Sequence, residues 1–132
     1  MYPPVLAPDA TLWATGYLRT ALAARPEPYC SGVFIGDKVP SQRRDRMVIV
    51  RRDGGRPDRL VDNPRLSFRI WAKTEQDASD LARMVAALLW AAPDGNPVVS
   101  VTPESGPSPV SDESGQPLRY LVMSFRTVGV QL

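Results

Sequence analysis

The sequence contains no histidine and a single cysteine, Cys30, among its 132 residues. Histidine is the side chain that most often exchanges protons near neutral pH, and it is the commonest metal ligand. One cysteine excludes an intrachain disulfide and a zinc site built from several cysteines. A single cysteine also indicates a protein that is made and used in a reducing cytosol. We therefore expect no catalytic triad, no metal centre and no cofactor site.

Long hydrophobic runs are also missing. The longest apolar stretch, from Met84 to Pro93, is far shorter than the roughly 20 residues that span a membrane. The start of the chain, Met1–Pro4, has no basic patch followed by an apolar stretch, so no signal peptide is expected. The length predicts one compact domain over residues 1–132.

The charges are nearly balanced in number but not in position. The sequence has 16 basic and 14 acidic residues, which gives a net charge of +2. Nine arginines lie between Arg43 and Arg69 against four acidic residues, whereas the segment 104–113 is acidic. A basic middle and acidic ends fit either nucleic-acid binding or self-association through opposite patches.

Hydrophobic periodicity predicts an α+β fold with the element order α-β-β-β-α-β-β. Residues 9–25, with Asp9 as N-cap, and residues 75–90, preceded by Thr74, have the apolar spacing of helices. Five strands are expected around them, at 32–36, 46–52, 66–73, 98–101 and 118–130. They form a mostly antiparallel sheet of four to five strands packed by two helices.

The connections carry their own signals. We expect the first three strands to form an antiparallel meander, with Asp53–Gly54–Gly55 as a hairpin turn. Residues 1–8 are proline-rich and expected to be extended. Residues 104–117 have few apolar side chains and predict a long exposed loop.

No group of residues has the pattern of a catalytic site, so the candidate functional residues are charged ones. Clustered arginines can bind an acidic protein surface or nucleic-acid phosphates, and they can equally form a solvated loop. The candidates for an interface are Arg43, Arg44, Arg46, Arg51, Arg52, Arg56, Asp112 and Glu113.

Between residues 8 and 130, a series of short segments occurs in an order and spacing typical of a known family. They are Ala23–Ala24–Arg25 at the end of the first helix, Val39–Pro40, Val48–Gly55, Asp62–Asn63–Pro64 before the strand through Trp71, the helix Ala78–Leu89, Ser105–Gly106–Pro107, Asp112, and Arg119–Tyr120. Their order and spacing resemble the small tail terminator proteins of long-tailed bacteriophages, especially phages that infect actinobacteria.

The resemblance implies a structural virion protein that assembles in the host bacterial cytoplasm. Copies form a ring, expected to be a hexamer, which caps the tail tube, stops its polymerisation and offers the surface to which the head attaches. The implied partners are the major tail tube protein and head–tail connector proteins, with DNA only as cargo passing through the lumen. No catalytic residues and no membrane contact are implied.

In this view the arginines of 41–46 and 51–59 contact an acidic neighbour or the tube. The loop 104–117 is expected to become ordered only on assembly. Charge reversal at Arg43, Arg44 and Arg46 is expected to block attachment without unfolding the monomer. The alternatives are a head–tail connector, head-closure or tail-completion protein, and, less favoured by the small net charge, a nucleic-acid-binding domain.

Overall fold

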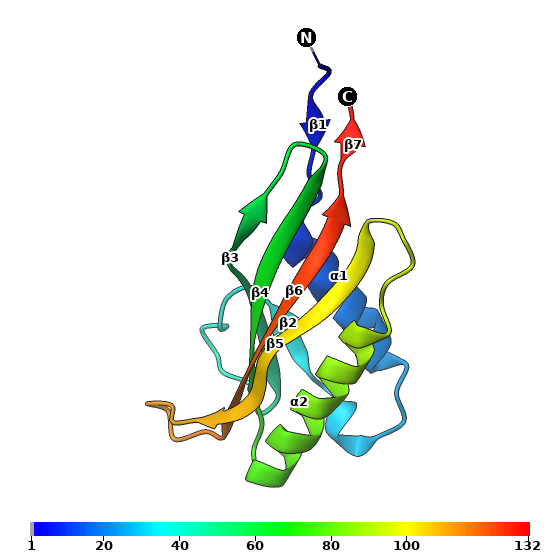
Figure 1. Cartoon of the computed structure of the whole chain (residues 1–132). Helices are drawn as coiled ribbons and strands as arrows, with labels where there is room; N and C mark the ends of the chain where they lie inside the picture. The colour runs from blue at the N-terminus through cyan, green and yellow to red at the C-terminus, as the bar shows by residue number, and fades with distance from the viewer. Residues whose placement is uncertain (1) are drawn as a thin grey trace.

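The computed structural model describes residues 2–132. Its fold is α+β: a twisted five-stranded sheet carries both helices on one face, and the two ends of the chain lie side by side at one tip (Figure 1). The predicted order α-β-β-β-α-β-β is present, with one further short strand at each end of the chain. The N-terminal segment includes the strand β1 (Val5–Leu6), and Met1 of the expected extended segment 1–8 lies outside the described residues.

The helices begin where their capping residues predict. The helix α1 (Ala10–Ala23) follows Asp9, whose carboxylate accepts a hydrogen bond from the Leu12 amide at 3.0 Å. The helix α2 (Glu75–Trp90) follows Thr74, whose hydroxyl accepts one from the Asp77 amide at 3.1 Å. Each cap satisfies an amide that has no partner inside its own helix. A short 3-10 turn, Pro28–Cys30, lies between α1 and the sheet.

The main sheet has the strand order β2-β3-β4-β6-β5. Its strands are β2 (Phe34–Gly36), β3 (Met47–Pro57), β4 (Val61–Trp71), β5 (Val98–Val110) and β6 (Leu118–Val128). The predicted meander is wrong for its first pair, because β2 and β3 are parallel, with Phe34 opposite Met47. Residues 37–46 are too many for a tight hairpin, and they return the chain to the starting end of the sheet.

The hairpin turn predicted at Asp53–Gly55 is also wrong. These residues lie inside β3, where a bulge shifts the pairing with β4 between Arg52 and Gly55. The reversal lies further on, where the Asp58 amide donates to the Val61 carbonyl at 3.0 Å. Gly54 and Gly55 have the positive φ angles of 94° and 98° that the prediction required, but they serve the bulge rather than a turn.

The predicted loop 104–117 is wrong over its first half. Strand β5 continues through Pro103, Pro107 and Pro109 to Val110, and it pairs with β6 throughout, with three register shifts. Proline cannot donate to a sheet, but β5 is an edge strand, where a missing donor can face outward. Only residues 111–117 form the connection between β5 and β6. Residues 104–110 are therefore already ordered as part of a strand in the monomer.

The main core lies between the sheet and the two helices. Alternation places Leu66, Phe68 and Ile70 of β4 toward the helices, where they pack with Leu18 of α1 and Leu81 of α2. The Met47–Val50 run of β3 is buried on both faces, as predicted from its continuous apolar character. A second, smaller cluster on the helix-free face consists of Met47, Ile49, Trp71 and Leu118, with Phe34 packed against it.

Candidate interaction surfaces

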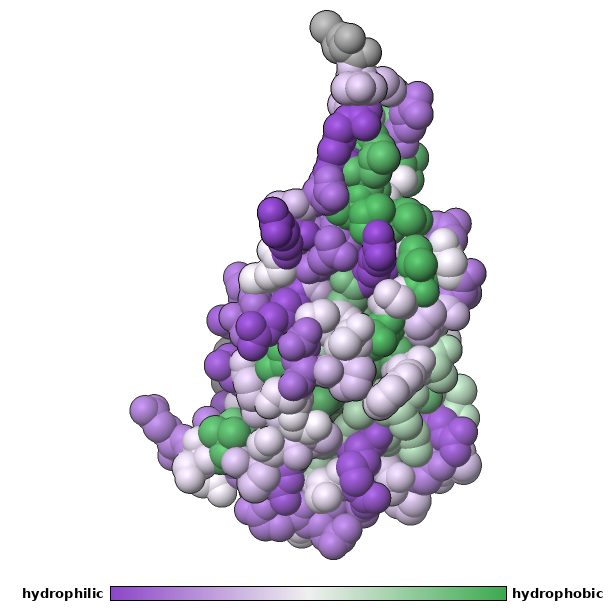
Figure 2. Space-filling view, in the orientation of Figure 1, coloured by the Kyte–Doolittle hydropathy of each residue, from purple (hydrophilic) through white to green (hydrophobic). Residues whose placement is uncertain are grey.

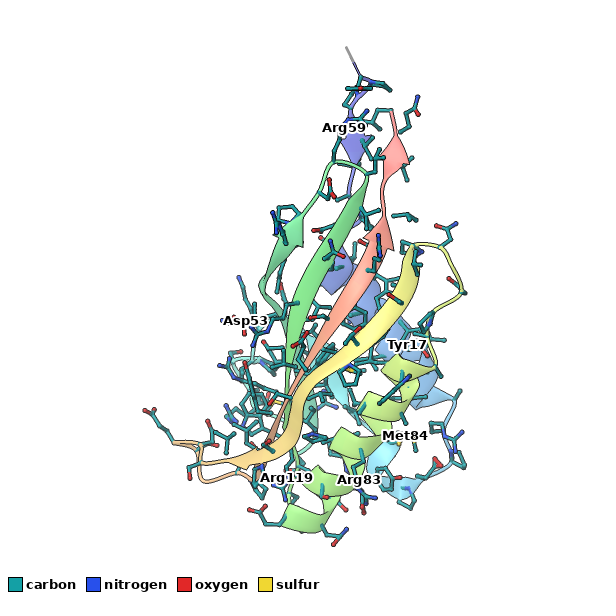
Figure 3. The ribbon with its side chains drawn as sticks, viewed as in Figure 1. Tyr17, Asp53, Arg59, Arg83, Met84 and Arg119 are labelled. Atoms are coloured by element: carbon teal, nitrogen blue, oxygen red, sulfur yellow. The ribbon has the colours of Figure 1, made fainter. Side chains whose placement is uncertain are left out.

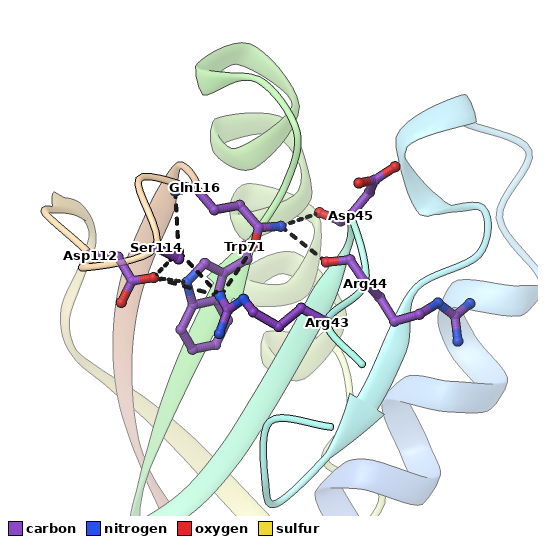
Figure 4. Close-up of polar contacts among 7 residues, drawn as sticks. All are labelled: Arg43, Arg44, Asp45, Trp71, Asp112, Ser114 and Gln116. Atoms are coloured by element: carbon purple, nitrogen blue, oxygen red, sulfur yellow. Dashed lines mark hydrogen bonds and ion pairs between the residues drawn. The ribbon is translucent and has the colours of Figure 1, made fainter. Parts of the chain in front are cut away.

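Arg43, the first of the candidate arginines, is bound within the chain rather than free. Its guanidinium lies 5.3 Å from the centre of the Trp71 ring and donates to the Gln116 side chain at 3.1 Å. It also lies 3.6 Å from the Asp112 carboxylate. Figure 4 shows how these residues join residues 43–45 to the 111–117 connection over the buried Trp71.

Asp112 is the acceptor at the centre of this cluster. It accepts hydrogen bonds from the Ser114 hydroxyl and from the Trp71 indole nitrogen, the latter at 3.1 Å. The Ser114 bond is the main cause that holds the pKa of the Asp112 carboxyl below its ordinary value, and the Trp71 bond acts in the same direction. The carboxylate therefore stays charged well below neutral pH and keeps the Trp71 donor satisfied.

Two further candidate arginines also pair inside the monomer. Arg46 donates to the Ser31 carbonyl and to Asp77, at the start of α2, at 3.0 and 3.1 Å. Arg52 forms a bidentate pair with Asp62, with nitrogen–oxygen distances of 2.6 and 2.9 Å. The hydrogen bond from Arg52 lowers the pKa of Asp62, a residue that is only 5% exposed. These arginines hold loops and strands together.

These contacts change two expectations. The segment 104–117 does not wait for assembly to become ordered, because its first half is strand and Arg43 and Trp71 hold its second half. Charge reversal at Arg43 and Arg46 would break contacts within the chain, so it does not test attachment alone. Three arginines of the basic middle therefore pair with carboxylates inside the molecule.

The remaining candidates are more exposed. Arg51 donates only to the Asp37 carbonyl, at 3.3 Å. Within residues 2–132, the side chains of Arg44, Arg56 and Glu113 have no hydrogen-bond or ion-pair partner, and all three are exposed. Arg56 lies on the sheet, whereas Arg44 and Glu113 lie on the connections at the opposite end of the molecule, so the structure does not bring the predicted set into one patch.

The sequence analysis missed an apolar surface at the tip of the molecule. There β1 pairs with β7 (Val130–Gln131), and the Gly129 amide donates to the Leu60 carbonyl in the β3–β4 turn at 3.1 Å. Arg59, labelled in Figure 3, lies 4.2 Å from the centre of the Tyr2 ring. We call residues 2–6, 58–60 and 129–132 the terminal arm.

The terminal arm exposes large apolar side chains. Leu6, Leu60, Val130 and Leu132 are 60%, 56%, 64% and 68% exposed. Figure 2 shows apolar residues gathered toward this end, where the molecule narrows to the paired chain ends. Single exposed apolar residues are ordinary, but a group on one narrow projection is typical of a surface that another molecule covers.

The helix-free face of the sheet carries a second surface that the sequence analysis did not single out. Arg65 of β4 and Arg126 of β6 line a groove there together with Arg56. The period-two pattern of β4 was the available signal, because it places Arg65 and Arg69 opposite the buried Leu66 and Phe68. We call Arg56, Arg65 and Arg126 with their polar neighbours the basic sheet face.

Reactive and metal-binding groups are sparse. Across residues 2–132, no three acidic, cysteine or histidine side chains come together in a way that could hold a metal ion. Cys30 is buried, and that burial raises the pKa of its thiol. No helix in the described part of the chain has the length and apolar character needed to cross a bilayer.

Neither a protein-family model nor a curated protein sequence matches this chain. The terminal arm and the basic sheet face are therefore the features from which a function can be inferred.

Proposed function

We propose that this chain is a structural virion protein whose copies form a ring at the end of a phage tail tube. The ring stops addition of the major tail tube protein and presents a surface to head–tail connector proteins. The chain acts by assembly and not by catalysis. The resemblance over residues 8–130 suggests six copies, assembly in the host bacterial cytoplasm, and passage of DNA through the lumen.

The terminal arm is the observation that carries this proposal. It is a ribbon of two residues in each strand, and a two-stranded ribbon with apolar side chains in water is only marginally stable by itself. Removing apolar surface from water stabilises by about 25 cal/mol for each Å². A neighbouring subunit that covers Leu6, Val130 and Leu132 would gain this free energy, less the cost of ordering and associating the two surfaces.

The position of the terminal arm also fits a ring. It lies at one tip of an elongated molecule (Figure 1), and its narrow shape differs from the broad sheet and helix faces. A contact from the arm to a different surface of the next copy is heterologous, and heterologous contacts generate a closed ring when the rotation closes. Neither edge strand of the main sheet is suited to pair with a neighbouring subunit, since β5 carries three prolines and β2 has only three residues.

Tail length measures the proposed activity directly. Tails assembled without this protein are expected to carry overlong tubes without a cap, visible by electron microscopy, and adding the purified protein back is expected to restore a uniform length. Tubes of normal length that fail to join heads would overturn the proposal and assign the chain to head–tail connection instead.

A further inference from the structure

Three arginines without a carboxylate partner in the described residues lie together on the basic sheet face. Arg56, Arg65 and Arg126 lie on β3, β4 and β6 and line one groove of about 640 Å³. All three are exposed, and within residues 2–132 none of their side chains has a hydrogen-bond acceptor or a carboxylate within ion-pair distance. Arg43, Arg46 and Arg52, by contrast, are each paired with a carboxylate.

The strand register brings neutral hydrogen-bonding groups between these arginines. Arg56 is opposite Asn63, Arg65 is opposite Ser124, and Arg126 is opposite Ser100 on β5. Thr102, opposite Ser124, also lines the groove. Neighbouring strands are about 4.8 Å apart, so the guanidinium groups flank a strip of amide and hydroxyl groups. One carboxylate, Glu104, is present and accepts from the Ser124 hydroxyl at 2.7 Å.

This combination matches a phosphate backbone better than a protein surface. Arginine, asparagine, serine and threonine side chains are the usual donors to nucleic-acid phosphates, and the planar guanidinium matches phosphate geometry. Protein interfaces usually combine buried arginines with tryptophan or tyrosine anchors, and neither of these two aromatic residue types is among the described residues that line this groove. Phe125 borders the groove, but its side chain is 2% exposed and packs into the main core on the helix side of the sheet.

The same groove argues for a duplex over a single strand. Binding of single strands uses exposed aromatic rings on which bases stack. Tyr120, further along this face, is occupied, because its ring lies 5.7 Å from the Arg69 guanidinium and its hydroxyl donates to Asp53 at 3.4 Å. We infer that the basic sheet face binds the phosphate backbone of double-stranded DNA without reading its sequence. This inference does not depend on the proposed ring.

The salt dependence of DNA binding tests the inference. Each phosphate contact contributes about 0.9 to the slope of log K against log salt. With three arginines, we expect a slope of about −2.7, so that affinity for a short mixed-sequence duplex falls roughly 40-fold between about 50 and 200 mM salt. Fluorescence anisotropy with the full chain measures both quantities.

Substitutions assign the binding to this face. Each of Arg56→Gln, Arg65→Gln and Arg126→Gln is expected to make the slope shallower by about 0.9, and the triple variant is expected to lose measurable binding. Arg44→Gln is the matched control, because Arg44 is also exposed and its side chain has no partner in residues 2–132, but it lines a different surface. Thermal melts followed by circular dichroism verify that each variant is folded.

Several results would overturn the inference. They are an absence of duplex binding by the wild-type chain at low salt, a triple variant with the wild-type slope, and an equal loss in Arg44→Gln. If the triple variant binds DNA normally but fails to attach to tail tubes, the face binds an acidic protein surface instead. Because DNA binding and tail length are measured separately, the inference and the proposed function can fail independently.

Discussion

At the scale of single residues, the Arg52–Asp62 pair shows how unevenly two partners share a contact. The side chain of Arg52 is 39% exposed, whereas the side chain of Asp62 is 5% exposed. Water can therefore hydrate the arginine if its partner is removed, but it cannot reach the carboxylate. Substituting Arg52 and substituting Asp62 should therefore lower the free energy of unfolding by different amounts.

Arg52→Ala is expected to lower the free energy of unfolding by about 3 kcal/mol or more at neutral pH, because it leaves a buried carboxylate unpaired. Asp62→Asn leaves a hydrated arginine and is expected to lower it by about 1–2 kcal/mol. Urea unfolding of both variants measures the asymmetry. Equal losses would mean that Asp62 is hydrated in solution.

The same pair predicts a pH dependence with a definite sign. Arg52 lowers the pKa of Asp62, so the stability from this pair is present above the unfolded value near about 3.9 and is lost as pH falls through the lower folded value. In Arg52→Ala burial is the larger remaining influence and raises that pKa, whereas the smaller effect of the Asn63 backbone hydrogen bond lowers it. The stability gap between variant and wild type should therefore narrow between pH 7 and pH 4, and a constant gap would contradict this.

Asp112 and its neighbour Glu113 give a matched pair of substitutions. Asp112→Ala removes the acceptor of the Trp71 indole N–H, whose residue is 4% exposed, and a buried unsatisfied donor costs about 1–3 kcal/mol. Glu113→Ala removes an exposed carboxylate that has no partner in the described residues, and it should change stability by less than about 0.5 kcal/mol. Urea unfolding and tryptophan fluorescence would separate the two, and an equal response would contradict the Asp112 contact.

At the scale of elements, the β3 bulge depends on two glycines that differ in their surroundings. Both have positive φ angles, 94° at Gly54 and 98° at Gly55. A Cβ atom added at Gly54 would meet nothing within 4 Å, whereas one at Gly55 would lie 2.2 Å from the Asn63 carbonyl oxygen. The backbone of β4 passes directly against Gly55, so only one of the two sites excludes a side chain by contact.

Gly54→Ala is expected to destabilise by about 1–2 kcal/mol, the effect of the left-handed backbone alone. Gly55→Ala adds a clash with backbone atoms of β4 that cannot move without breaking the sheet, and we expect a loss above about 4 kcal/mol. Chemical denaturation of the two variants tests the difference. A Gly55 variant as stable as the Gly54 variant would show that the bulge can open.

The elements that the sequence predicts are those whose signals are local. Asp9 and Thr74 cap helices within three residues of themselves, and the Met47–Val50 run indicates its own burial on both faces. Other features depend on distant partners. Arg43 contacts Gln116 and Arg46 contacts Asp77 across 73 and 31 residues of sequence, so neither pairing could be predicted from spacing.

Proline gave a misleading signal for a related reason. Pro103 predicts the end of a strand, because it lacks the amide hydrogen that a central strand needs. Strand β5 continues to Val110 because it lies at the sheet edge, and edge position is a property of the whole sheet. The terminal arm was missed similarly, since the pairing of Leu6 with Val130 joins the two ends of the chain.

At the scale of the whole molecule, the two surfaces have opposite character. The terminal arm is apolar and narrow, whereas the basic sheet face is charged and broad (Figure 2). A net charge of +2 hides this division, because three of the nine arginines between Arg43 and Arg69 pair with carboxylates inside the chain, whereas Arg56 and Arg65 on the basic sheet face have no such partner within residues 2–132. Apolar burial would drive the proposed subunit contact and is not weakened by salt, whereas phosphate binding weakens steeply with salt.

Self-assembly is therefore expected to depend on the terminal arm and not on charge. Leu6→Asp with Val130→Asp places two carboxylates on the surface that a neighbour would cover, and burying an unpaired charge is strongly unfavourable. We expect this double variant to remain monomeric at concentrations where the wild-type chain forms a ring, as measured by native mass spectrometry and sedimentation. Leu12→Asp is the matched control, because Leu12 is 69% exposed on α1, outside the arm. A double variant that still forms rings, or a control that loses them, would show that the subunits meet through another surface.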